Sequence, residues 1–140
     1  MLAQPHLLYT TTLLRLFYDL DCPPRPGFRE EGFTQGIEGR FPGTMLARRA
    51  VFDRVGPFDP AFAVAFEVGW FARAQDLQVP SGVVEEVLLH KRIHATNNAI
   101  QRERFRRECF AVMRRSLLRK RALQDASGRS ALTEKPAEAL

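Results

Sequence analysis

Proline and glycine residues cluster at three places in this 140-residue chain, and they confine regular structure to the segments between them. Proline fixes the backbone angle φ and lacks an N–H donor, while glycine adopts conformations that other residues avoid. The largest cluster occupies residues 22–42, and the two smaller ones are Gly56-Pro57 and the four residues from Val79 to Gly82. We therefore predict an irregular loop over 22–42, and a loop of this length is often functional.

The segments between the clusters carry strand and helix patterns in turn. Residues 6–18 are rich in threonine and aromatic side chains, which favours a strand, or two strands with a bend. In residues 66–77, apolar side chains recur at helical spacing on one face. The remaining predicted elements are a short strand at 44–47, a short helix at 48–55, one or two strands at 83–93, and a long helix at 99–121 capped by Asn97 or Asn98. Together they predict an α/β or α+β fold that ends in a long helix.

The composition is that of one globular domain with an unevenly placed positive charge. Hydrophobic residues make up 45% of the chain, and no apolar run approaches the roughly 18 residues that span a bilayer. Because the N-terminus lacks the pattern of a secretory signal, we expect a cytoplasmic protein with free thiols at Cys22 and Cys109. The formal net charge is +5, yet residues 101–121 hold nine Lys or Arg against two Glu. Such a basic helix can meet phosphates or an anionic membrane, and a solvated face is the plainer alternative.

Three sequence motifs follow one another in the chain: GTMLARRAVFDRVGPFDP at 43–60, FEVGWFARA at 66–74 and LLHKRIHATN at 88–97. In this order and spacing they resemble the C-terminal half of a family 2, GT-A-type glycosyltransferase, over roughly residues 6–121. The family's nucleotide-binding half and its metal-binding DxD motif have no counterpart upstream of residue 6. The resemblance therefore implies an incomplete GT-A-like three-layer sheet with flanking helices, followed by a flexible tail over 122–140. Asp19-Leu20-Asp21 matches DxD formally, but it falls after the family's position for that motif, so we read it as a turn.

The resemblance also implies roles for individual residues. Glu67 falls where the family's catalytic aspartate lies, at a helix start, and a carboxylate there can accept the proton of an attacking hydroxyl. Phe66 and Gly69 stand where the family has its other two acidic residues. His94 takes the position of a histidine that lies near the metal and the diphosphate. The residues implied to contact the substrate are Gly43, Thr44, Trp70, Arg73, Arg92 and Asn97.

Several of these residues also have a plainer structural role, which the sequence leaves open. The helix dipole favours an acidic residue such as Glu67 in a first turn without any chemistry. Trp70 lies at the spacing of a core residue, and Asn97 can serve as a helix cap. His94 at a strand end can be a hydrogen-bonded structural residue.

The resemblance implies transfer of a sugar from a nucleotide-sugar to a hydroxyl acceptor, with Mg or Mn as the cofactor. We expect the isolated chain to be inactive until a complementing chain or a homo-oligomer completes the site. The alternatives are a non-catalytic interaction module that uses the open edge of a truncated sheet, and an adaptor that binds an anionic membrane surface through the basic helix. Nucleic acid is not expected as a partner, because no recognition fold accompanies the positive charge.

Overall fold

The computed structural model describes residues 4–22, 29–94 and 102–133, with side chains through residue 126. Its sheet is built around one long strand, β1 (Tyr9–Tyr18). The edge strand β4 (Ser81–Ile93) pairs with β1 in parallel along its whole length, from Tyr9 opposite Ser81 to Tyr18 opposite Ile93. Two short strands, β2 (Ile37–Glu38) and β3 (Leu46–Ala47), pair antiparallel with β1. Because β4 takes one edge of β1, the two short strands share the other, and the four-stranded sheet is mixed.

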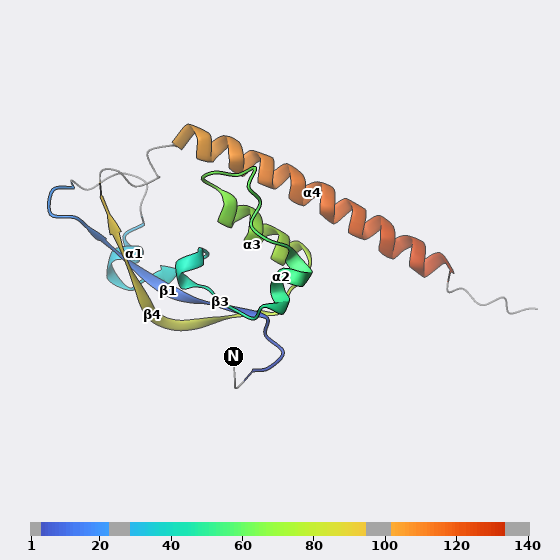
Figure 1. Ribbon diagram of the computed structural model, residues 1–140, viewed down its shortest axis with the longest axis horizontal. Coiled ribbons are helices and arrows are strands. Elements are labelled where there is room, and N and C mark those ends of the chain that lie inside the picture. Colours follow the sequence, from blue (N-terminus) through green and yellow to red (C-terminus); the bar gives the residue numbers. More distant parts are fainter. Residues whose placement is uncertain (1–3, 23–28, 95–101, 134–140) are drawn as a thin grey trace, which may run out of the picture.

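The pairing of β4 with β1 is irregular in the middle. Thr12 lies opposite Val84 and Leu13 opposite Val87, so Glu85 and Glu86 are extra residues on β4. Such insertions are β-bulges, which bend a strand and increase its twist. Figure 1 shows the result, since β4 curves strongly along the lower side of the sheet.

The helices stack in two layers on the sheet. The helices α2 (Ala50–Val55) and α3 (Phe66–Asp76) lie next to the sheet, and the long helix α4 (Arg102–Thr133) packs on α3. Figure 1 shows α3 between the sheet and α4, and the far end of α4 extending beyond the rest of the described chain. A short helix, α1 (Glu31–Thr34), and a 3-10 turn, η1 (Pro42–Thr44), flank β2.

Apolar side chains from β1, α2 and α3 form the larger of two cores. Trp70 and Val51 are fully buried in it. The ring of Trp70 lies 5.5 Å from that of Tyr9 and 5.3 Å from that of Phe71, both edge to face, which is a favourable aromatic geometry. A smaller core at the other end of β1 contains Leu14, Leu16, Cys22 and Ile93. The larger core therefore holds α3 against the sheet.

The predicted fold class is confirmed: the chain has a mixed α/β architecture with flanking helices and a long C-terminal helix. Three details differ from the prediction. The strand predicted at 44–47 is limited to β3, because Thr44 belongs to the η1 turn. The segment 22–42 contains α1 and β2 besides loop, because β2 completes hydrogen bonds on the free edge of β1. The last helix continues past 121 to Thr133, into the predicted tail. Among the described residues, no helix combines the length and apolar character needed to cross a membrane.

Candidate functional site

Glu67 lies in the first turn of α3, as predicted. Its Oε2 atom is buried and has no hydrogen-bond partner among the described residues. On α4, burial raises the pKa of the Cys109 thiol, and the negative charges of Glu67 and Glu108 raise it further. Since buried polar atoms are nearly always hydrogen-bonded, an unsatisfied carboxylate oxygen is unusual and invites a functional explanation.

Glu108 of α4 holds the backbone that leads into α3. The residue before the helix, Ala65, makes no side-chain cap, and the N–H groups of Val64 and Ala65 each donate to Glu108 Oε2 at 2.9 Å. The N–H of Ala63 donates to Oε1 at 3.3 Å, and Arg104 bridges the same oxygen at 2.9 Å. Burial opposes ionisation of this carboxyl, but the backbone hydrogen bonds and Arg104 outweigh it and lower the pKa of Glu108 to about 2. One side chain of α4 therefore supplies negative charge at the N-terminus of α3, where the helix dipole favours it.

We expect Glu108→Gln to destabilise the fold by about 2 kcal/mol at neutral pH, because charge-assisted hydrogen bonds to three N–H groups are weakened. The pKa of Glu108 falls from its ordinary value of 4.5 to about 2 on folding. Its stabilisation is therefore complete above about pH 4.5 and is lost as pH falls toward 2. Urea unfolding at several pH values should show a shallower acid decline in the variant.

Glu103→Gln is the matched control, since Glu103 lies on the same helix and its side chain is 65% exposed in a pair with Arg106. We expect it to change stability by less than about 0.5 kcal/mol. Equal losses in the two variants would mean that Glu108 does not hold α3.

Asp76 ties the other end of α3 to α4. Its side chain is only 2% exposed and accepts hydrogen bonds from Ser116 at 2.8 Å and from Arg119 Nε at 2.9 Å. Between the two ends, Val112 of α4 packs 3.5 Å from the place where a side chain on Gly69 would begin. The same position is 3.3 Å from the Phe62 ring, so a side chain longer than one carbon at Gly69 would have to displace Phe62 or Val112.

The substrate-binding role predicted for Trp70 does not fit the structure. Trp70 is 0% exposed and its Nε1 donates to the carbonyl of Gly56 at 2.9 Å, so it is a core residue. Gly43 and Thr44 shape the η1 turn. The hydroxyl of Thr44 donates to the carbonyls of Gly39 and, at 2.8 Å, Phe41. A side chain on Gly43 would begin 2.5 Å from the far end of the Phe41 ring, so that ring would have to move to admit it.

The remaining predicted contacts are spread over the molecule. Arg73 lies on α3, facing α4, and donates to the carbonyl of Pro57. Arg92 and His94 are near the end of β4, where Arg92 lies 3.4 Å from Asp19 and His94 is partly buried. Asn97 lies outside the described residues. The turn expected at Asp19–Asp21 is present, closed by a hydrogen bond from Cys22 N–H to the carbonyl of Asp19.

The described residues do not by themselves form a metal site. They contain no group of three or more His, Cys, Asp or Glu side chains that could hold an ion. His94 is a single candidate ligand, so the Mg or Mn cofactor stays a prediction, and no chemical step is derived through it.

The structure also has a polar pocket that was not predicted from the sequence. It is open, has a volume of about 300 Å³, and lies where α3 meets the strands β1 and β4. Hydrogen-bonding side chains dominate its walls, among them the Glu38–Arg40 ion pair at 3.1 Å. Its walls include Tyr9, Thr11, Glu38, Arg40, Phe71, Gln75, Gln78 and Ser81. Polar side chains together with the Tyr9 and Phe71 rings suit a polyhydroxylated ligand.

The chain is thus a mixed α/β domain in which α3 lines a polar pocket and carries Glu67, whose Oε2 atom is buried. Comparison with models of known protein families, with curated proteins and with solved structures gave no match for this chain.

Proposed function

We propose that this chain is the acceptor-side half of a GT-A-type glycosyltransferase, with Glu67 as the general base. The observation that carries the proposal is the buried Oε2 of Glu67, which has no hydrogen-bond partner among the described residues. A carboxylate oxygen in this state can accept the proton of a substrate hydroxyl that comes within hydrogen-bond reach. The same residue is the one that the motif order assigns as the base.

The polar pocket supports the proposal as a place for the acceptor. Glu67, Phe71 and Gln75 follow one another at intervals of four residues, so they share one face of α3. Phe71 and Gln75 line the pocket. An acceptor bound there would lie on the same helix face as the proposed base.

The free edge of the sheet supports the expectation that a second half completes the site. Among the described residues, β4 pairs only with β1, although it is 13 residues long. It also exposes Val83 and Leu88, which are 47% and 62% accessible. A long unpaired edge with apolar side chains is a template for an added strand.

Complementation tests the proposal. The chain is fused to the C-terminus of the donor-binding half of a GT-A transferase, in place of that enzyme's own acceptor half. Sugar transfer by this chimera to a panel of hydroxyl acceptors is then measured with Mn²⁺. We expect transfer above the level of the donor half alone. A chimera that folds and binds its nucleotide-sugar, yet transfers no sugar to any acceptor, would count against the proposal.

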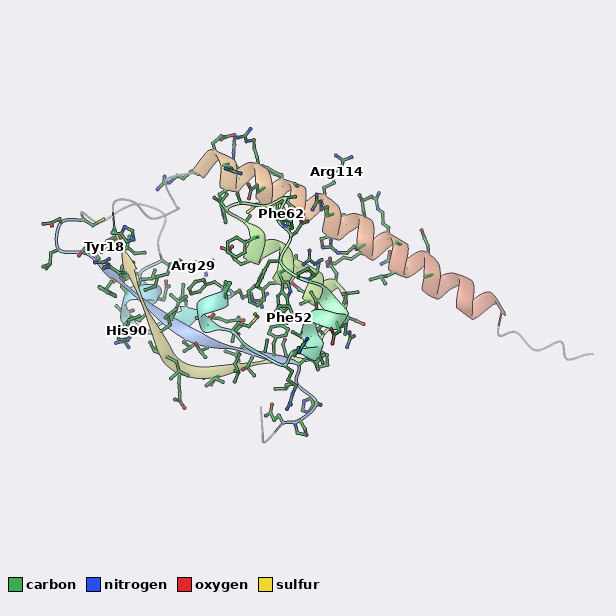
Figure 2. The ribbon with its side chains drawn as sticks, viewed as in Figure 1. Tyr18, Arg29, Phe52, Phe62, His90 and Arg114 are labelled. Atoms are coloured by element: carbon green, nitrogen blue, oxygen red, sulfur yellow. The ribbon has the colours of Figure 1, made fainter. Side chains whose placement is uncertain are left out.

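A second candidate function is attachment to an anionic membrane surface through α4. Phe110, Met113 and Leu117 are 60%, 51% and 58% exposed, and their spacing places them on one side of the helix. Arg114 and Arg121 flank them and are exposed too. Figure 2 shows Arg114 on the side of α4 that faces away from the rest of the domain. Exposed apolar side chains bordered by arginine are typical of helices that lie in a membrane interface.

Vesicle sedimentation measures this attachment. We expect the chain to pellet with phosphatidylserine-rich vesicles and less with phosphatidylcholine alone, and added salt should weaken binding. Replacing Phe110, Met113 and Leu117 together by serine should weaken it at least about tenfold, because their apolar surface is no longer buried. If neither added salt nor the triple substitution changes vesicle binding, α4 does not have this role.

A further inference from the structure

A small pocket lies between α3 and α4, away from the polar pocket described above. Its volume is about 90 Å³, and its walls come from α3, α4 and the segment that precedes α3. Three arginines line it: Arg73 from α3, and Arg115 and Arg119 from α4. Among the described residues that line it, Asp59 alone is acidic.

The two arginines of α4 are held in place by other side chains. Arg115 lies 2.5 Å from Asp59, and its guanidinium sits over the Phe62 ring, 4.6 Å from the centroid. Figure 2 shows Phe62 beneath α4. Arg119 binds Asp76 through Nε at 2.9 Å and Nη2 at 2.8 Å. Because both guanidinium groups are anchored, little conformational entropy is lost when they bind a further group.

Arg73 brings an unsatisfied donor to the same place. Its Nε atom is buried and has no hydrogen-bond partner among the described residues. Burial lowers the pKa of Arg73, the charge of Asp59 opposes this shift, and the charges of Arg119 and Arg115 add to it. The charges of Arg115 and Arg119 therefore repel that of Arg73, while the Asp59 carboxylate attracts it.

The charges that face the pocket leave an excess of positive charge. A guanidinium has five N–H donors and no acceptor, so three of them offer more donors than Asp59 and Asp76 can take. Lys120 also lies 3.6 Å from Asp76, which adds a further positive charge. A group that fills this pocket should be a compact anion with several acceptor oxygens.

We propose that this pocket binds a phosphate group. Three guanidinium groups approach from two helices, and a tetrahedral phosphate presents oxygens in several directions, whereas a planar carboxylate is matched by one guanidinium fork. The narrow volume admits the phosphate group itself, either as free phosphate or at the end of an ester. This binding site does not depend on the transferase proposal or on Glu67.

Titration of the full chain with inorganic phosphate tests the site, at constant ionic strength with chloride as the balancing anion. We expect phosphate to raise the melting temperature and to shift the amide NMR signals of Gly69, Arg73 and Val112. Arg73→Gln should weaken phosphate binding by roughly tenfold to a hundredfold, because a charge-assisted hydrogen bond is lost. Arg114→Gln removes the same charge from an exposed position on α4, and it should leave the affinity within about twofold.

A parallel titration with phenyl phosphate separates the two sources of the phosphate group. An affinity similar to that of inorganic phosphate indicates that the site accepts an ester, and a weaker affinity indicates that it binds free phosphate. If Arg73→Gln does not fold, the NMR map of the unaltered chain decides. Any of three results would overturn the proposal. These are NMR shifts scattered along the arginines of α4, a loss of phosphate affinity in Arg114→Gln equal to that in Arg73→Gln, and no response to millimolar phosphate.

Discussion

Trp70→Ala is expected to lower the free energy of unfolding by about 3–5 kcal/mol, which is the usual cost of removing a buried aromatic side chain. Trp70 is 0% exposed, and its ring contacts those of Tyr9, Phe52, Phe58 and Phe71. The substitution would leave a cavity where β1, α2 and α3 meet, and the carbonyl of Gly56 would lose its hydrogen bond from Nε1. Single domains are stable by only about 5–15 kcal/mol, so the variant should be close to unfolding.

Urea unfolding followed by far-UV circular dichroism measures this change, because Trp70 is the single tryptophan and its fluorescence is lost with it. Trp70→Phe keeps most of the apolar volume and should lose about half as much or less. Phe110→Ala removes an aromatic side chain that is 60% exposed, and it should change stability by less than about 0.5 kcal/mol. If Trp70→Ala were as mild as Phe110→Ala, Trp70 would not be the centre of the core.

The elements of this fold were largely predictable, because each is bounded by a local signal. Glycine ended α2, and the spacing of Phe66, Trp70 and Ala74 gave α3 to within about one residue. The strand β2 could not be predicted, since it is held by its pairing with β1 and not by its own two residues. The extension of α4 to Thr133 could not be predicted either, because its C-terminal turns carry no apolar periodicity.

The candidate site was less predictable than the fold, because it depends on which chain segments meet. The sequence placed Glu67 at a helix start, but it gave no sign that Glu108 would bind the backbone before that helix from 43–45 positions away. Arg40 meets Gln75 and Gln78 only because β2 and β4 both pair with β1. For Trp70, the motif predicts a substrate contact and the helical spacing predicts a core residue; its full burial agrees with the core residue.

Glu67→Gln is expected to lower sugar transfer by the complemented chain about a hundredfold to ten-thousandfold, the range that general base catalysis contributes. Glutamine has nearly the same shape, but its amide cannot take up the proton of the attacking hydroxyl. Because Oε2 of Glu67 has no hydrogen-bond partner among the described residues, removing its charge should disturb the fold little. The loss should therefore appear in kcat, with unchanged binding of the nucleotide-sugar.

Glu103→Gln provides the matched control, since the side chain of Glu103 is 65% exposed on α4, away from the β4 edge, and the substitution removes the same charge. The most direct measurement compares kcat for sugar transfer by the Glu67→Gln and Glu103→Gln chimeras at one pH and one acceptor concentration. Glu67 as the base predicts a loss of at least about a hundredfold in the first and less than about twofold in the second. Equal rates in the two folded chimeras would contradict the assignment of Glu67 as the base.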